Sequence, residues 1–467
     1  MFTYIKYQRL NPFLFLPGKK TISKTLLLTF FALFSAAAQT TDQKLTLTLD
    51  DAVKIALESN WDVKMGIQDT KKAEEQINEA YSNAYPNISF SGNYTRNIKM
   101  PVMFIPPNSL LNPTSSTQTF ELGSKNSYTA SITVAQTIYN QKVNTAIKIA
   151  DEFASYSRTG LKASRNEVIL NVKKAFLNIL LMSELVDVSR KSYESADANY
   201  KNVSALYKQG VASEYDYLRS EVQRANVQPM LIQMENNYQL AKNYLKTLLA
   251  IDAKKEIEVK GEFKFEELPQ ATIDEYSAGV IENSPLVEQL KINESLLGKS
   301  LIIERSEYYP TLAAFGQYQY QTQDNTFQVG NYKWAESFMV GLQLSYNIFD
   351  GFKRGARIEQ VKIDRDKIGF ARQKLQDGLI LQTQQSRMKM VEAKKRIEAQ
   401  VENLKQAEKT SSIAQTRYKS GVGTQLEIID TETALLAART NYSQAIFDFL
   451  TAKADWEYAV SKEYQSE

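Results

Sequence analysis

The 467-residue sequence contains no cysteine and no histidine. Without cysteine the chain can form no disulfide, cannot use a thiol nucleophile and cannot carry a lipid on an N-terminal cysteine. Without histidine it lacks the commonest metal ligand and the commonest general base. The sequence also contains no glycine-rich phosphate loop and no nucleophile elbow. These absences argue against an enzyme, and we expect no cofactor and no metal site.

The first 38 residues differ in composition from the rest of the chain. They contain five basic residues and no acidic one, and an apolar run over 25–38 ends in three alanines. This pattern is typical of a signal peptide cleaved before Gln39, and the run is too short to favour a membrane anchor. Removing these five of the 56 basic residues leaves 51 against 53 acidic ones, a net charge of about −2. The nominal charge of +3 therefore gives no reason to expect a nucleic-acid partner.

Two stretches of the chain, 206–225 and 417–436, resemble each other at a shift of 211 residues. The shift superimposes Tyr207 on Tyr418, Gly210 on Gly421, and Ser213 on Thr424. In each, Gly-Val followed by Ser or Thr predicts a helix end, a tight turn and a new N-cap, as at the tip of a helical hairpin. Residues 48–94 also resemble 272–318, and 128–139 resemble 338–349. Three blocks in the same order indicate an internal duplication, with additional residues between Tyr94 and Tyr128 in the first copy.

The duplication divides the chain into a signal peptide (1–38), a first repeat (39–251), a linker (252–272) and a second repeat (273–467). Each repeat is expected to begin with a helix, which spans 45–84 in the first copy and ends at Tyr309 in the second. A strand–loop–strand segment follows, at 88–139 and 311–349, because apolar and polar residues alternate there. The alternation is clearest over 338–348, whereas 100–126 reads as an irregular loop rich in proline and asparagine.

A long helix follows each pair of strands, at 141–207 and 352–418, and leads to tips at 208–214 and 419–425 and then to return helices. The first long helix carries a heptad stripe, which predicts a coiled-coil seam over a helix on the order of 100 Å long. We expect this seam to be too extended for one chain to bury. The stripe consists of Val168, Val172, Ala175, Ile179, Met182, Val186, Ser189, Tyr193, Ala196, Tyr200, Val203 and Tyr207.

Four strands of about ten residues suit a tilted crossing of a bilayer, but four strands cannot close on themselves. An open strand edge in hydrocarbon costs several kcal/mol per unpaired backbone group, so further copies of the chain must complete the sheet. Two copies would give eight strands, too narrow for a wide pore, and three would give twelve. A periplasmic coiled-coil scaffold or a membrane-surface protein would leave the four amphipathic strands unexplained.

The signal peptide, the duplication, the strand–loop–strand inserts and the two tips resemble the TolC family of outer-membrane efflux channels over almost the whole mature chain. The resemblance implies an α+β membrane protein. It would form a homotrimer with a twelve-stranded transmembrane β-barrel in outer-membrane lipid and a long α-helical barrel in the periplasm. It also implies a passive exit duct that binds a periplasmic adaptor protein and an inner-membrane pump. A type I protein secretion duct has the same architecture and stays open as an alternative.

The resemblance also implies roles for residues at the tips. The pore-facing acids of the family match Glu427 and Asp430, and its gate hydrogen bond matches Tyr418 and Asp216. Without the family context, two acids spaced by three would more simply be a solvated helix face. Where the family has a second gate residue, an arginine, this chain has Gly423, so that link is absent or differently made. The adaptor-contacting turns match Gly210, Val211, Ala212, Gly421, Val422 and Gly423.

Overall fold

The structure is a computed structural model and describes residues 45–266, 269, 282 and 284–461. The expected signal peptide, its cleavage site before Gln39 and the start of the second repeat lie outside the described residues.

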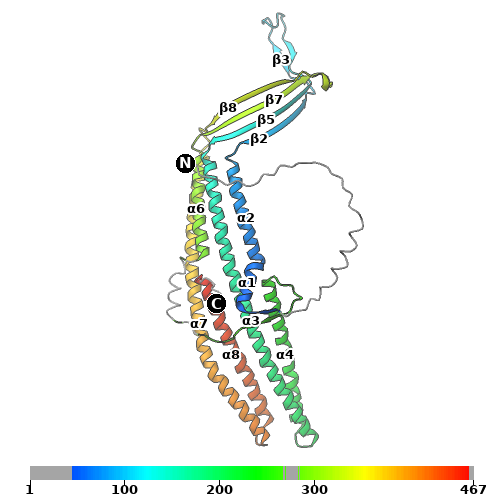
Figure 1. Cartoon of the computed structure of the whole chain (residues 1–467), viewed down its shortest axis with the longest axis vertical. Helices are drawn as coiled ribbons and strands as arrows, with labels where there is room; N and C mark the ends of the chain where they lie inside the picture. Colours follow the sequence, from blue (N-terminus) through cyan, green and yellow to red (C-terminus); the bar gives the residue numbers. More distant parts are fainter. Residues whose placement is uncertain (1–44, 267–268, 270–281, 283, 462–467) are drawn as a thin grey trace, which may run out of the picture.

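The chain is elongated, with a β-sheet at one end and long helices extending away from it (Figure 1). Within the first part of the chain the elements are β1 (Leu45–Leu47), α1 (Leu49–Ser59), α2 (Trp61–Ser82), β2 (Asn87–Arg96), β3 (Val102–Ile105), β4 (Gln118–Glu121), β5 (Asn126–Tyr139), α3 (Gln141–Lys208), α4 (Glu214–Leu248) and β6 (Ile257–Val259). The second part contains α6 (Pro285–Ser306), β7 (Thr311–Asp324), the 3-10 helix η1 (Val329–Asn331), β8 (Ala335–Ser345), α7 (Lys353–Lys419) and α8 (Gln425–Ala459). The two hairpin tips, α3–α4 and α7–α8, lie together at the end farthest from the sheet.

The expected single helix over 45–84 is wrong, because this segment contains β1, α1 and α2. Asn60 ends α1 and caps α2, since its side-chain oxygen accepts hydrogen bonds from the backbone N–H groups of Asp62 and Val63. Its amide also donates to the carbonyl of Leu248 at 2.8 Å. The apolar period continues across Asn60, so periodicity alone does not reveal the break. Before it, β1 pairs in parallel with β6 of the linker, with Leu45 opposite Ile257.

The four-stranded sheet has the order β2-β5-β7-β8, and all its neighbouring strands are antiparallel. The register places Phe90, Ile132, Tyr318 and Phe338 in one row across the four strands, and Ile88, Val134, Gly316 and Val340 in the next. The apolar side chains in these rows are exposed, and those of Phe90, Phe338 and Val340 are more than 70% exposed. Aromatic pairs such as Tyr94–Tyr128 and Tyr320–Trp334 stack at the end of the sheet farthest from the helices. The sheet thus presents a continuous apolar face bordered by aromatic rings.

Residues 100–126 are not an irregular loop throughout, as the sequence suggested. They contain a two-stranded antiparallel sheet in which β3 pairs with β4, with Val102 opposite Glu121. Each strand has only four residues, and prolines flank β3, so the alternation is too short to predict a strand. Figure 1 shows this β3–β4 hairpin projecting beyond the four-stranded sheet, away from the helices.

The heptad stripe of α3 is mostly buried inside the chain itself, contrary to the expectation that one chain could not cover it. Ile179 is 1% exposed and Val186 9%, because α3 packs along α4 on one side and along α6 and α8 on the other. Exposed apolar residues instead follow α4 and α7. On α4 they include Leu218, Val222, Ile232, Leu240 and Tyr244, and on α7 they include Ile363, Phe370, Leu381, Met388, Val391, Val401 and Ile413.

Two apolar cores hold the helices together. One joins α1, α2, α3, α4, β1 and β6 and includes Val172, Phe176, Leu245 and Ile257. The other joins α6, α7 and α8 and includes Ile397, Phe449 and Trp456. Pro229 lies inside α4, which continues through it as one helix. Among the described residues, no helix is both long and apolar enough to cross a membrane.

Candidate functional site

The two hairpin tips are built by the same hydrogen bonds. At the first, Gly210 has a φ of 75°, its N–H bonds to the carbonyl of Tyr207, and the N–H of Val211 bonds to that of Leu206. At the second, Gly421 has a φ of 76° and bonds to Tyr418, while Val422 bonds to Arg417. This is the Schellman helix end, which needs a residue in the left-handed region and therefore favours glycine.

Each turn then starts the next helix with a hydroxyl cap. The side-chain oxygen of Ser213 accepts from the N–H of Asp216, and that of Thr424 accepts from the N–H of Glu427. Asp216 and Glu427 therefore occupy the same position of the two tips, the third residue of the helix. At this end of a helix the backbone dipole favours a negative charge. Val211 and Val422 project into solvent at the turns, 71% and 65% exposed.

The two tip acids differ in their partners. Asp216 accepts a hydrogen bond from the hydroxyl of Ser213 at 2.7 Å, which keeps it within its own capping turn. Glu427 instead accepts from the guanidinium Nε of Arg417 at 3.3 Å. Asp430 lies one helical turn beyond Glu427 and is exposed, and no ion pair of Asp430 is found among the described residues. Glu427 and Asp430 are spaced so that both side chains lie on one side of α8.

Tyr418 and Asp216 approach each other across the two hairpins. Burial raises the pKa of the Tyr418 phenol, and the nearby carboxylate of Asp216 raises this pKa further. Within the described part of the chain the two side chains form no hydrogen bond, and one oxygen of the Asp216 carboxylate accepts from the hydroxyl of Ser213.

Gly423 follows the second turn and lies too close to the backbone for any side chain. A Cβ atom there would lie 2.8 Å from the backbone nitrogen of Tyr418 and 3.0 Å from the carbonyl carbon of Arg417. The N–H of Gly423 bonds to the carbonyl of Arg417 at 3.0 Å, whereas the N–H of Ala212 at the first tip is 3.3 Å from the carbonyl of Leu206. The second turn is therefore tighter, and this tightness requires glycine at 423.

A cluster of tyrosines above the first tip was not predicted as a unit. The rings of Tyr207 and Tyr217 stack at 5.1 Å, and the hydroxyls of Tyr200 and Tyr217 are 3.5 Å apart. The hydrogen bond with Tyr200 and the charge of Glu221 raise the pKa of Tyr217 to about 12. Arg224 packs over the ring of Tyr200 and forms an ion pair with Asp197 at 2.8 Å. The heptad spacing of the tyrosines on α3 is visible in the sequence, but their partners on α4 are not.

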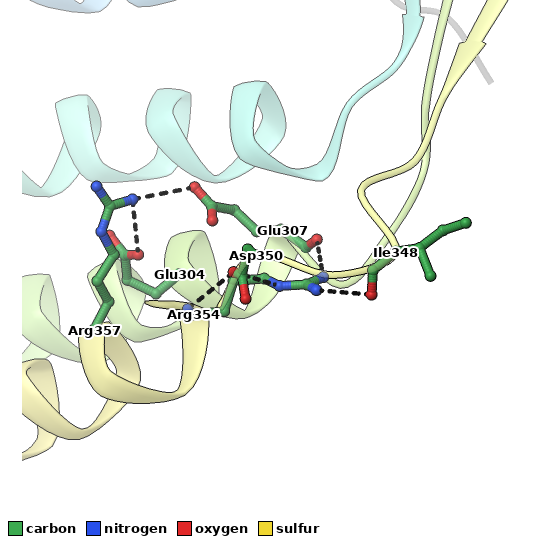
Figure 2. Close-up of polar contacts among 6 residues, drawn as sticks. All are labelled: Glu304, Glu307, Ile348, Asp350, Arg354 and Arg357. Carbon is green, nitrogen blue, oxygen red and sulfur yellow. Dashed lines mark hydrogen bonds and ion pairs between the residues drawn. The ribbon is translucent and has the colours of Figure 1, made fainter. Parts of the chain in front are cut away.

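A second cluster that the sequence did not reveal lies where the sheet joins the helices (Figure 2). The guanidinium of Arg354, which is 6% exposed, donates to Asp350 at 2.8 Å and to the carbonyls of Glu307 and Ile348. Asp350 also accepts the backbone N–H of Arg354 at 3.0 Å. Burial alone would raise the pKa of Asp350, but Arg354 holds it below its usual value. The cluster fixes the direction in which α7 leaves the sheet.

A four-stranded sheet with an exposed apolar face, continued by helical hairpins far longer than those of compact domains, defines the class of outer-membrane channels to which TolC belongs. The comparisons with known proteins agree. A sequence profile described as "Outer membrane efflux protein" matches residues 52–250 and 279–455. No curated protein sequence matches the chain significantly.

Solved outer-membrane channels have the same fold as this chain. The Campylobacter jejuni CmeC channel is similar with a TM-score of 0.70 and 16% identity, over 88% of this chain and 85% of that one. The open state of the Neisseria gonorrhoeae MtrE channel gives 0.68 and 16%, over 88% of each chain. VceC of Vibrio cholerae gives 0.68 and 14%, over 88% of this chain and 95% of that one. The chain belongs to the outer membrane efflux protein family. It is an outer-membrane efflux channel of the TolC type and not an enzyme.

Proposed function

We propose that three copies of the chain form a continuous duct, with twelve strands in the outer membrane and the helices in the periplasm. The arrangement of the sheet carries this proposal. In the described structure β2 and β8 each have one unpaired edge, and the apolar side chains on the outer face are exposed. Hydrocarbon tolerates an apolar face but not an open edge, so β2 of one copy pairs with β8 of the next.

The helices support the same assembly. Since α2 leads into β2 and α7 follows β8, pairing these edges brings α7 of one copy beside α2 and α4 of its neighbour. Exposed apolar side chains occur on each of these helices, including Met65 on α2, Leu240 on α4 and Phe370 on α7. Such stripes on opposite edges of one chain fit a ring of identical copies.

The tips form the narrow periplasmic end of this duct in our proposal. Glu427 and Asp430 line the constriction, and a hydrogen bond between Tyr418 and Asp216 closes it. The turns at Gly210, Val211, Ala212, Gly421, Val422 and Gly423 contact a periplasmic adaptor protein, which connects the duct to an inner-membrane pump. The two exposed valines give the adaptor an apolar anchor at each tip.

Reconstitution of the mature protein in planar bilayers tests the duct and its gate. We expect a trimer in detergent and a channel of low resting conductance that favours cations, because rings of carboxylates attract them. Glu427→Ala with Asp430→Ala should weaken this selectivity without affecting assembly. Tyr418→Phe with Asp216→Ala should raise the conductance instead. A monomer that stays soluble without detergent would contradict the duct. Unchanged selectivity in the first double variant would contradict the placement of the two acids.

A further inference from the structure

The two tips share a fold but not a charge pattern, and one of the differences lies at Arg417. The 211-residue shift superimposes Leu206 on Arg417, and Asp216 on Glu427. The shift also superimposes Arg219 on Asp430. The backbone carbonyls of Leu206 and Arg417 are equivalent, since each accepts hydrogen bonds from the N–H groups of the two residues after the turn glycine. At this pair of positions only the second tip therefore has a cation, and Arg417 lies beside Glu427.

The Arg417 side chain contacts both the turn of the second tip and the helix that follows it. Its Nε donates to Glu427 at 3.3 Å, and another guanidinium nitrogen donates to the carbonyl of Val422 at 3.3 Å. The absence of a side chain at Gly423 keeps the turn tight, with the N–H of Gly423 on the Arg417 carbonyl. One residue thus binds the turn through its carbonyl and the first acid of α8 through its guanidinium.

Stability does not account for this pair. The side chains of Arg417 and Glu427 are 50% and 40% exposed, and exposed pairs typically contribute only about 0–1 kcal/mol. The pair instead changes the local charge of the tip. The guanidinium forms an ion pair with Glu427, whereas no ion pair of Asp430, on the same side of α8, is found among the described residues.

We propose that Arg417 determines the ion selectivity of the second tip by neutralising Glu427, so that of these two acids only Asp430 contributes an uncompensated negative charge to the constriction. This inference rests on the proposed function, in which the tips form the narrow end of the duct. It assigns different roles to two acids that the sequence places side by side. It also makes Arg417 a selectivity-determining residue on the opposite helix of the hairpin.

Reversal potentials of the full mature protein in planar bilayers under a KCl gradient test the proposal. Arg417→Leu, which introduces the residue of the first tip, should raise the cation-to-anion permeability ratio roughly threefold or more, because each copy gains one uncompensated carboxylate. Arg417→Lys keeps the charge and should keep the ratio of the unmodified protein. Glu427→Gln alone should shift the ratio toward anions, and the same change added to Arg417→Leu should restore the original ratio.

Arg439→Leu provides a matched control. Arg439 forms an ion pair with Glu408 at 3.2 Å between the same two helices. It lies about 18 Å from Glu427 along α8 at ~1.5 Å per residue, beyond the screening length of about 8 Å at physiological salt. This control removes the same charge from the same hairpin and should leave the ratio unchanged.

Two results would overturn the proposal, and the second of them would also contradict the proposed placement of the gate. If Asp430→Asn lowers the ratio while Arg417→Leu behaves like Arg439→Leu, the tips are the constriction but Arg417 does not set its charge. If Asp430→Asn, Glu427→Gln and Arg417→Leu all leave the ratio of a conducting channel unchanged, the tips are not the constriction, and the proposed placement of the gate is wrong as well. Trimers of normal yield for each variant exclude misfolding as the cause.

Discussion

Replacing Ile179 by aspartate distinguishes the packing inside one chain from the packing between copies. Ile179 lies in the core formed by α1, α3 and α4 and is 1% exposed. Truncating a buried isoleucine to alanine typically costs about 2–5 kcal/mol, and an unpaired buried carboxylate adds several kcal/mol more. That sum approaches the ~5–15 kcal/mol that stabilises a typical domain. We therefore expect Ile179→Asp to unfold the α3–α4 hairpin within each chain.

The matched change on the outer stripe should affect assembly alone. Phe370 is on α7 and is 75% exposed in the single chain, so Phe370→Asp exposes a charge where water already has access. The chain should fold with its full helicity, but the charge would be buried against the neighbouring copy and should prevent the trimer. Circular dichroism reports the helicity, and size exclusion in detergent reports the trimer.

The contrast between the two variants is the informative result. Loss of helicity in Ile179→Asp together with folded, unassembled chains of Phe370→Asp supports the division into an inner seam and an outer stripe. A normal trimer of Ile179→Asp would show that α3 does not pack as described. A normal trimer of Phe370→Asp would show that the stripe on α7 faces water or the lumen.

Three further predictions concern the second tip, the junction between sheet and helices, and the β3–β4 hairpin. Gly423→Ala should destabilise the second turn by about 1–3 kcal/mol, because the added Cβ meets backbone atoms that cannot move aside. Amide hydrogen exchange at positions 422 and 423 should therefore become faster. The reverse change at the first tip, Ala212→Gly, should not speed exchange there. The pKa of Asp350 is lowered in the folded chain, so its pairing with Arg354 stabilises the junction above the ordinary carboxylate pKa, near 3.8, and is lost as the pH falls through the lowered value. Asp350→Asn should remove this acid-dependent step from thermal unfolding curves. Protease added to intact cells should cleave within the β3–β4 hairpin, which faces the cell exterior in the proposed assembly, and cleavage near Gly210 instead would mean the opposite orientation.

Strands and helices could be predicted because each has its own period. The alternation over 338–348 corresponds to β8 and the segment just after it, and the uninterrupted helical pattern after Asn140 corresponds to α3. A break between two helices could not be predicted where the apolar pattern continues across it. Asn60 interrupts a helical pattern without changing it, and its side-chain amide also bonds to Leu248, far away in the sequence. The heptad stripe was visible as well, but whether its partner is the same chain or another copy depends on tertiary packing.

The candidate site could be predicted only as far as the backbone determines it. The turn glycines and the capping hydroxyls follow from local rules, which is why both tips were located from the sequence. The partners of the acids do not follow from such rules. Arg417 comes before the turn and Glu427 after it, so their contact depends on how tightly the turn closes at Gly423. The Arg354 cluster likewise requires Glu307, Ile348 and Asp350 to meet at the end of the sheet.

The pairing of distant strands has a consequence for the order in which the molecule can form. The two outer pairs of the sheet, β2–β5 and β7–β8, join neighbouring parts of the chain, but β5 pairs with β7, and Asn126 bonds to Thr326, 200 residues away. The parallel pair of β1 and β6 joins residues at a similar separation in the sequence. Contacts of such separation form slowly, because a long loop must close before they contribute any stability. A chain emerging into the periplasm therefore exposes its apolar hairpin β2–β5 until β7, in the early part of the second repeat, has followed. During this interval the unpaired edge of β5 can pair with the wrong strand, so the incomplete sheet is prone to aggregation.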